Sequence, residues 1–309
     1  MKVAVFGGSG FVGKYILKTL IQNNYRPYTF IRFGSEHKVE HLKELNIITG
    51  DITNNTAIEQ TIMNCSAVIY NIGIIREFPK KGVTYQKSHY EYSKIVMDIS
   101  KKYNIKHFIL MSANGIKKDG VGYQRTKYLA EEYLKNSGLN YTIFRPSLIF
   151  GRPSGDKEFC SELRDTMIKL PLPAPLFFDG LNIFSAGDFK MSPIHVQNVA
   201  EFFVKSIANE KHYMKTYHLG GLETFNWKEI IQLISKSLRK HKFMVPAPVL
   251  PVWILALLLD RFSLFPITRD QLTMLLEGNT CDSRELFKDF DIIPIPFTTK
   301  SLSYLRKND

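Results

Sequence analysis

The sequence has 309 residues, of which 44% are hydrophobic and 23% are charged. This length suits one large domain or two joined ones, and this composition excludes disordered, collagen-like and disulfide-built chains. The 41 Lys and Arg residues exceed the 29 Asp and Glu residues, which leaves a formal net charge of +12. That excess favours an anionic partner: a phosphorylated ligand, a membrane surface or a nucleic acid.

The cysteines and the N-terminus indicate the compartment. Cys65, Cys160 and Cys281 are widely spaced and form no C-x-x-C motif. We therefore expect no disulfide framework and no metal site, and a reducing environment. The first residues run into an apolar segment without a signal or transit pattern. We expect a cytoplasmic protein, with a peripheral position on a membrane as the alternative.

The first 150 residues alternate between short apolar runs and amphipathic segments. The pattern predicts strands at residues 3–6, 28–32, 46–49, 67–70, 107–111 and 141–145, and helices at 11–22, 37–45, 56–63, 88–103 and 123–136. Apolar strands that alternate with helices are typical of a parallel sheet covered on both faces. We therefore predict an α/β fold with a doubly wound parallel (Rossmann) sheet in residues 1–150.

After residue 150 the alternation ends. Residues 171–175 are proline-rich, residues 177–189 are aromatic with interspersed glycines, and helical periodicity returns at 194–207 and 227–239. We predict a smaller mixed region at 151–309 that carries the substrate. A ligand would then lie where this region meets the sheet.

A glycine-rich segment joins the first predicted strand to the first predicted helix. It reads Gly7, Gly8, Ser9, Gly10, Phe11, Val12 and Gly13. Glycines at this spacing allow a tight turn and bring the backbone close to a pyrophosphate at a helix N-terminus. The segment predicts a site for a nicotinamide dinucleotide.

The end of the second predicted strand bears on which dinucleotide is bound. An NAD site places Asp or Glu roughly 20 residues after the glycines, but Arg32 stands there. Because arginine pairs with a 2′-phosphate, we favour NADP(H), with NAD(H) as the alternative. Asp51, after the third strand, either contacts the adenine amino group or caps the next helix.

The pattern Y-x-x-x-K occurs at Tyr123/Lys127 and at Tyr90/Lys94. Residues i and i+4 share a helix face, so the lysine is expected to lower the pKa of the phenol and fit it for proton transfer. Tyr123 opens the helix after the strand that ends at Ser112, where ligands bind in parallel sheets. We therefore predict Tyr123, Lys127 and Ser112 as catalytic residues.

Other candidates are weaker. We expect His195 to be structural, and Arg145 to shape the substrate pocket. A basic cluster at residues 236–242 precedes an apolar stretch at 243–259 that contains Trp253. We take 236–262 as a candidate membrane-surface segment, with a core helix that covers the pocket as the alternative.

The glycine segment with Ser112, Tyr123 and Lys127 resembles the short-chain dehydrogenase/reductase superfamily, in its extended or atypical branch. Residues 71–77, 112–115, 145–151, 192–200, 251–253 and 265–279 narrow this resemblance to the atypical family that contains the NAD(P)H-binding accessory subunit of respiratory complex I and its bacterial relatives. The resemblance implies a Rossmann fold and a Ser–Tyr–Lys set at Ser112, Tyr123 and Lys127. We also expect cofactor contacts at Ile52, Asn71, Gly73 and Lys127.

Two functions follow from these observations. The first is an NADP(H)-dependent oxidoreductase that acts on an unidentified small or lipophilic carbonyl or quinone-like substrate. The second is a non-catalytic nucleotide-binding scaffold or redox sensor, because the complex I subunit is regarded as structural. The net charge alone, without a recognisable nucleic-acid-binding motif, does not support a nucleic-acid partner. A membrane-complex partner is the other expectation.

Overall fold

The structure is a computed structural model that describes residues 1–155, 158–259 and 268–306. The chain forms two compact units. The first contains Met1–Pro146, Val196–Leu219 and Leu286–Ile292, and the second contains Ser147–His195, Gly220–Glu285 and Ile293–Asp309. Residues 196–219 and 286–292, which the sequence pattern places in the second region, pack with the first unit.

The first unit is built on a seven-stranded sheet in the order β11-β6-β5-β4-β1-β2-β3. Every neighbouring pair is parallel, as in β1 beside β2 and β5 beside β6. The strands are β1 (Lys2–Phe6), β2 (Arg26–Arg32), β3 (Asn46–Gly50), β4 (Ala67–Tyr70), β5 (His107–Met111), β6 (Tyr141–Pro146) and β11 (Lys215–Leu219). The predicted doubly wound parallel sheet is confirmed.

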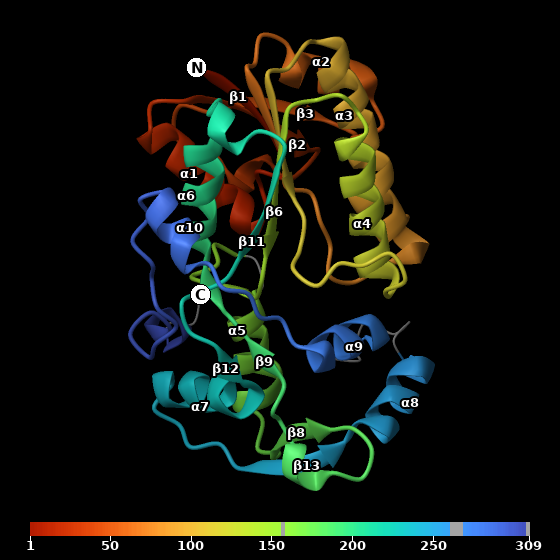
Figure 1. Ribbon diagram of the computed structural model, residues 1–309, viewed down its shortest axis with the longest axis vertical. Coiled ribbons are helices and arrows are strands. Elements are labelled where there is room, and N and C mark those ends of the chain that lie inside the picture. The colour runs from red at the N-terminus through yellow and green to blue at the C-terminus, as the bar shows by residue number, and fades with distance from the viewer. Residues whose placement is uncertain (156–157, 260–267, 307–309) are drawn as a thin grey trace. The chain divides into compact units, whose positions relative to one another are not determined.

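Helices cover both faces of this sheet. In Figure 1, α1 and α6 lie on one side of the strands, and α2, α3 and α4 lie on the other. The helices are α1 (Phe11–Gln22), α2 (Asn55–Ile62), α3 (Tyr92–Lys102), α4 (Gly122–Lys135), α6 (Val196–Ser206) and α10 (Arg284–Asp289). After Lys2 in β1 and His107 in β5, the residues of β1, β4 and β5 are all buried, which explains why these strands are continuously apolar instead of alternating.

Two elements of the first unit differ from the expectation. The predicted helix at 37–45 is absent, and only the 3-10 turn η1 (Glu36–Lys38) forms there. Only Val39 of residues 37–45 is buried, and Glu44 has a left-handed φ of 73°. The apolar residues at helical spacing, Leu42 and Leu45, stay partly exposed, so the segment lacks the tertiary packing that stabilises a short helix. Strand β11 was not predicted, because its edge position leaves most of its residues partly exposed.

The second unit is smaller and irregular. Its three sheets have two strands each: β10 with β7, β12 with β9, and β13 with β8. The strands are β7 (Ile149–Phe150), β8 (Ala174–Phe178), β9 (Lys190–Met191), β10 (Ile194–His195), β12 (Phe225–Asn226) and β13 (Met244–Pro248), and the helices are α5 (Phe159–Leu163), α7 (Trp227–Ser237), α8 (Val249–Leu259) and α9 (Arg269–Glu277).

Buried aromatic packing holds the second unit together. Trp227 is 2% exposed, and its indole Nε1 donates to the carbonyl of Pro175 at 2.9 Å. Asn226 caps α7 by accepting from the backbone N–H of Glu229, whose carboxylate accepts in turn from the N–H of Asn226. This reciprocal cap fixes where α7 begins and therefore where Trp227 enters the core.

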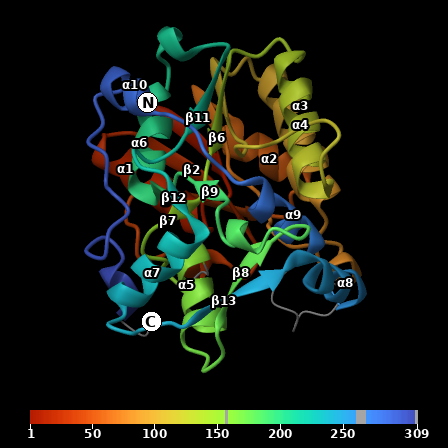
Figure 2. The same ribbon diagram turned by 60° about the horizontal axis from the view of Figure 1, so that its bottom comes forward.

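The apolar stretch at 243–259 is not one helix. Residues 244–248 form β13, which pairs in parallel with β8, and α8 follows directly, as Figure 2 shows. Pro246 and Pro248 explain the break, since proline favours an extended edge strand over a helix interior. Residues 260–262 of the candidate membrane-surface segment lie outside the described residues. Within the described ranges, no helix has the length and apolar character that crossing a bilayer requires.

Candidate functional site

The glycine segment forms the turn between β1 and α1. Gly7 has a φ of 91°, and a Cβ there would lie 2.7 Å from the backbone carbonyl carbon of Asn71 at the end of β4. A Cβ on Gly13 would lie 2.0 Å from the carbonyl oxygen of Gly7. Both positions therefore require glycine, because any side chain would push the turn away from the strand or the helix.

The outer side of the same turn is open. A Cβ on Gly10 would meet only the Gly7 carbonyl oxygen, at 3.6 Å. Gly10 is the N-cap of α1, and it offers no side chain to the first backbone N–H groups of the helix. The first turn also holds no acidic residue. The positive end of the helix dipole is thus left for an anion, which fits a pyrophosphate.

The remaining residues of the segment complete this cradle. Gly8 is buried, with its Cβ position 2.3 Å from the hydroxyl oxygen of Thr29 on β2. Ser9, Phe11 and Val12 are half-buried. The segment is therefore closed toward the protein and accessible at Ser9 and Gly10.

Arg32 lies exposed at the carboxyl end of β2. In the part of the chain that the structure describes, no ion pair or hydrogen bond engages its side chain. Phe33 is 69% exposed, and Gly34 has a φ of 78°. An exposed guanidinium beside an exposed ring can pair with a phosphate and stack on a base.

Asp51 follows β3 and is exposed. Its Oδ1 accepts from the hydroxyl of Thr53 at 2.6 Å and from the backbone N–H of Thr53 at 2.8 Å, and these bonds lower the pKa of Asp51. The alternative expectation, that Asp51 caps the following helix, is wrong, because the side chain of Asn54 caps α2. Ile52 is half-buried and packs against the core of the first unit.

The loop after β4 connects the glycine turn to the predicted catalytic lysine. The side-chain amide of Asn71 donates to the carbonyl of Gly7 at 3.4 Å. The Cβ position of Gly73 lies 3.7 Å from Nζ of Lys127 and 3.8 Å from Nε2 of His89. The structure therefore brings Asn71 to the glycine turn and Gly73 to Lys127.

Lys127 is buried on α4, one turn after Tyr123. Its Nζ donates to the carbonyl of Met111 at 3.1 Å and lies 5.7 Å from the centroid of the Tyr123 ring. Burial lowers the pKa of Lys127 to about 8, and Glu131 opposes that shift. The lysine thus faces the end of β5 as well as the tyrosine.

The expected effect of Lys127 on the phenol is wrong. Burial raises the pKa of Tyr123 to about 12 instead. The ammonium lies over the face of the ring and bonds to a backbone carbonyl, so its charge does not offset the loss of hydration around the hydroxyl. The second Y-x-x-x-K tyrosine, Tyr90, packs against the core and meets Tyr133 edge to face at 6.4 Å.

Ser112 follows β5 directly. The residue is 3% exposed, and its Oγ is buried without a hydrogen-bond partner among the described residues. Ser112 makes no hydrogen bond with Tyr123 there, but it adjoins Met111, which accepts from Lys127. A buried hydroxyl without a partner carries a desolvation cost, so it suits a position that a ligand oxygen completes.

Sequence reasoning missed His89. It lies in the π-helical turn η3 (Gln86–Glu91), and its ring stacks on Tyr85 at 5.3 Å and meets Tyr123 edge to face at 5.0 Å. Nδ1 lies 3.0 Å from the hydroxyl of Thr126, and Nε2 lies 3.1 Å from the carbonyl of Ile74. Burial, and then the charge of Lys127, lower the pKa of His89 to about 2, so the ring is neutral. The sequence did contain a signal for this contact: Tyr85 and His89 are four residues apart, a spacing that puts two side chains on the same face of a helix.

An ion pair between Arg145 and Glu131 connects β6 to α4. Arg145 binds the buried carboxylate of Glu131 with two hydrogen bonds, at 2.9 and 2.6 Å. Its remaining nitrogen lies 3.5 Å from His218, whose Nδ1 lies 2.6 Å from Asn114. Arg145 therefore anchors β6 to α4, a structural contact that differs from the expected role in shaping the substrate pocket.

His195 belongs to the second unit. Its ring meets Phe150 edge to face at 5.1 Å, and burial lowers the pKa of His195 to about 4. Among the described residues, no three His, Cys, Asp or Glu side chains are grouped so that they could hold a metal. These contacts favour a packing role for His195.

Comparison with known proteins agrees with this geometry. Residues 7–168 match the NAD(P)H-binding family, and residues 120–253 match the RmlD substrate binding domain. The mitochondrial NADH-ubiquinone oxidoreductase 40 kDa subunit of Neurospora crassa is 24% identical over 313 residues, which cover 98% of this chain and 78% of the subunit.

Two further similarities extend the comparison. The chloroplastic divinyl chlorophyllide a 8-vinyl-reductase of Arabidopsis thaliana is 25% identical over 236 residues, which cover 72% of this chain and only 53% of the reductase. The structure of UDP-glucose 4-epimerase from Thermotoga maritima superposes with a TM-score of 0.73 at 16% identity, over 99% of this chain and 97% of the epimerase. At that identity the superposition establishes the fold alone.

The NAD(P)H-binding match spans more than half of the chain and starts at the first glycine of the cradle. The predicted resemblance is therefore confirmed: the chain belongs to the NAD(P)H-binding family, as an atypical member of the short-chain dehydrogenases/reductases.

Proposed function

We propose that the chain is an NADP(H)-dependent oxidoreductase that reduces a small or lipophilic carbonyl or quinone-like substrate. The observation that carries this proposal is the buried Oγ of Ser112, which has no partner among the described residues and adjoins the carbonyl held by Lys127. A substrate oxygen would supply the missing partner. The cradle at Gly7–Gly13, with Arg32, Asp51, Ile52, Asn71 and Gly73, would hold the dinucleotide.

The side chains divide the chemistry between them. Bound NADP(H) supplies or accepts the hydride. Because burial raises the pKa of Tyr123 to about 12, its hydroxyl stays protonated at neutral pH and can donate a proton to a substrate oxygen. Lys127 positions the end of β5 through the Met111 carbonyl, and we assign it contact with the nicotinamide ribose. Ser112 would orient the substrate oxygen.

The substrate class rests on the relatives. One relative is named as a subunit of an NADH-ubiquinone oxidoreductase and another as a divinyl chlorophyllide reductase, and both names refer to the redox chemistry of lipophilic molecules. We assign the substrate-binding role to residues 151–309, in line with the RmlD substrate binding match over 120–253.

A non-catalytic nucleotide-holding scaffold or redox sensor is the second candidate. The contact between Lys127 and the Met111 carbonyl favours it, as does a pKa of Tyr123 that is raised instead of lowered. In this case the lysine would stabilise the fold around a resident nucleotide. The accessory-subunit relative supports the same candidate.

Turnover separates the two candidates. Mass spectrometry of the purified protein would identify the bound nucleotide, which we expect to be NADP(H). NADPH oxidation would then be followed with carbonyl and quinone acceptors for wild type, Tyr123→Phe and the matched control Tyr90→Phe. We expect Tyr123→Phe to lower kcat by roughly 100-fold or more, and Tyr90→Phe to leave it unchanged. Equal slow rates for all three proteins with every acceptor would favour the scaffold.

Cofactor preference tests Arg32 separately. Arg32→Asp should weaken NADPH binding by about tenfold or more, since a charge-assisted bond to the 2′-phosphate is lost, and should improve NADH binding. Arg26→Asp is the matched control, because Arg26 is exposed at the opposite end of β2. Fluorescence titration with both nucleotides measures the change. An unchanged preference in Arg32→Asp would remove Arg32 from the site.

We also propose that the protein is cytoplasmic and associates peripherally with an anionic membrane or a membrane complex. All three cysteines are free thiols, which suits a reducing compartment. Strands β8 and β13 are parallel, so the loop after β8 and helix α8 both begin at the carboxyl-terminal edge of this two-stranded sheet. That edge carries the exposed apolar side chains of Leu181, Phe184, Leu250 and Trp253. The basic residues 236–242 precede β13, at its other end, and a surface that combines exposed apolar and basic side chains is typical of a membrane contact.

A further inference from the structure

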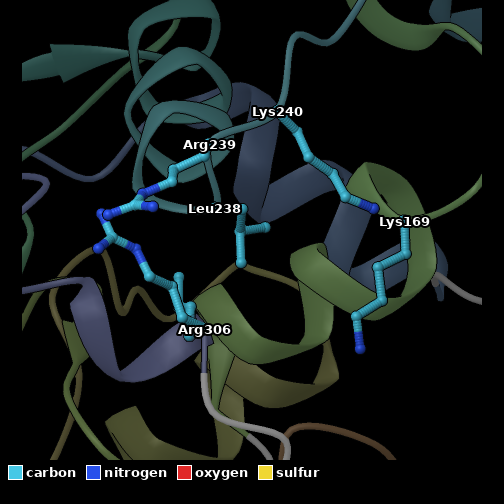
Figure 3. Close-up of a pocket in the computed structure, with 6 residues that line it drawn as sticks. Lys169, Leu238, Arg239, Lys240 and Arg306 are labelled. Carbon is cyan, nitrogen blue, oxygen red and sulfur yellow. The ribbon is translucent and has the colours of Figure 1, made fainter.

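The second unit contains a cavity of about 460 Å³ whose lining is mostly cationic. It lies at the end of α7 and against the 3-10 turn η7 (Ser303–Arg306). Its lining consists of Lys169, Leu238, Arg239, Lys240, Leu305 and Arg306. In Figure 3 the guanidinium groups of Arg239 and Arg306 point toward one another, and the side chains of Lys240 and Lys169 lie on the other side of Leu238.

Some nearby cations have a structural task. Nε of Arg306 donates to the carbonyl of Ser237, and Nζ of Lys242 donates to the carbonyl of Leu170 at 2.6 Å. Lys169 pairs with Asp165 at 2.9 Å. These contacts hold the end of α7 and the chain around residue 170 in place.

Arg239 and Lys240 have no such task. Across residues 1–155, 158–259 and 268–306, their side chains make no ion pair and no hydrogen bond. The last carbonyls of α7 are already satisfied, because the backbone N–H of Lys240 donates to Ser235 at 2.9 Å and that of Arg239 donates to Lys236 at 3.0 Å. Capping of the helix therefore does not account for either charge.

A second, smaller cavity shares Lys240 with the first. It measures about 160 Å³, and its lining includes Ser235, Lys236, His241 and Lys242. Ser235 is 3% exposed, and its Oγ is buried with no hydrogen-bond partner among the described residues. Burial, and then the charge of Lys240, lower the pKa of Lys242. The two cavities thus bring several cationic side chains close to a hydroxyl that lacks a hydrogen-bond partner among the described residues. A bound anion would reduce the repulsion between the cations and could accept a hydrogen bond from the hydroxyl.

We infer that this cationic cavity binds a phosphate group. Guanidinium groups that face each other can bind the oxygens of one phosphate bidentately, and the ammonium groups of Lys240 and Lys169 on the other side of Leu238 add to the positive charge of the cavity. The larger cavity falls within the range of about 300–1,000 Å³ that is typical of small-molecule sites. The phosphate comes either from a soluble phosphorylated molecule or from a lipid headgroup. The residues of this site belong to the second unit and those of the glycine cradle to the first, so the inference goes beyond the proposed oxidoreductase activity.

Binding of inorganic phosphate by the full chain tests the inference. Phosphorus-31 NMR line broadening would be compared for wild type, Arg239→Gln, Lys240→Gln and the matched control Lys228→Gln. Lys228 is exposed in the first turn of α7 and lines neither cavity. The tested side chains make no structural contact, so we expect all variants to keep the wild-type thermal midpoint. We expect each cavity variant to lose about tenfold in phosphate affinity, with Lys228→Gln unchanged.

Vesicle sedimentation distinguishes the two sources of phosphate. Phosphatidylcholine vesicles with and without phosphatidic acid would be mixed with the same four proteins. Loss of binding to inorganic phosphate in the cavity variants supports a soluble phosphorylated molecule. Loss of sedimentation with phosphatidic acid vesicles alone, without any binding of inorganic phosphate, supports a lipid headgroup. Binding that is equal in wild type and in both cavity variants, or absent from wild type in both assays, overturns the inference.

Discussion

At the scale of single residues, Lys127 links the two halves of the candidate site. The spacing of four from Tyr123 correctly predicts that both side chains share a face of α4, and the centroid of the phenol ring lies 5.7 Å from Nζ. Spacing cannot reveal that Nζ also reaches the carbonyl of Met111. It also cannot reveal the cost of burial, which depends on packing around α4 and which shifts the pKa values of both residues.

Burial of Lys127 should appear in the pH dependence of stability. Its pKa falls from 10.5 to about 8 on folding. Between these values the unfolded chain holds more protons than the folded one, so the free energy of unfolding should rise with pH, by up to about 3 kcal/mol. In Lys127→Met this rise of the unfolding free energy with pH should be absent, because methionine does not titrate.

Urea unfolding at a series of pH values from about 7 to 11 measures this effect, as the difference between wild type and variant across the window set by the two pKa values. Lys135→Met is the matched control, because Lys135 lies on the same helix and is partly exposed. Parallel curves for wild type and Lys127→Met would show that Lys127 is not desolvated in the folded protein.

At the scale of elements, the glycines of the turn between β1 and α1 have two different roles, which the sequence motif does not distinguish: some are required for close packing and others leave room for a ligand. Gly13→Ala places a Cβ 2.0 Å from the Gly7 carbonyl oxygen, so we expect a loss of stability of about 3 kcal/mol or more as well as loss of nucleotide binding. Gly10→Ala places a Cβ at an ordinary distance of 3.6 Å. We therefore expect Gly10→Ala to fold normally and to bind NADPH more weakly, since its methyl group occupies the side of the turn that is open to a pyrophosphate.

Thermal unfolding and NADPH titration of both variants test this separation. Gly155→Ala is the control for backbone strain outside the turn: its φ of 75° disfavours alanine although its Cβ position is open, so we expect a modest loss of stability and an unchanged NADPH affinity. A Gly10→Ala protein with wild-type NADPH affinity would place the pyrophosphate away from this turn.

The elements that sequence predicts well are those whose environment is uniform. Strands β1, β4 and β5 are buried on both faces, so their apolar runs are unambiguous. The helix predicted at 37–45 failed because its pattern has no partner surface, with Val39 as its only buried residue. His89 was missed because its environment comes from Tyr85, Thr126 and Ile74, and only the folded chain brings these residues together.

At the scale of the whole molecule, the cations behind the net charge of +12 differ in whether they already bond to carbonyls or carboxylates. Arg32 is exposed near the glycine cradle, whereas Arg239 and Lys240 face a cavity of the second unit. The composition predicted an anionic partner but could not divide the charge among cofactor, cavity and surface. That division depends on which cations already bond to carbonyls or carboxylates, as Lys242 and Arg145 do.

Exposed apolar side chains of the second unit, on α8 and in the loop after β8, could add hydrophobic binding to the electrostatic attraction of a membrane. Leu250 is 66% exposed and Trp253 is 38% exposed on α8, and β13 separates this helix from the basic residues 236–242. We expect wild-type protein to sediment with vesicles that contain phosphatidylglycerol at low salt, and less at high salt because the ionic part is screened. Leu250→Ser and Trp253→Ser should each lower vesicle affinity by roughly tenfold or more, since each removes exposed apolar area that the membrane would bury. Leu222→Ser, at a 43% exposed position outside α8, should not. Absence of wild-type sedimentation at low salt would reject the membrane contact.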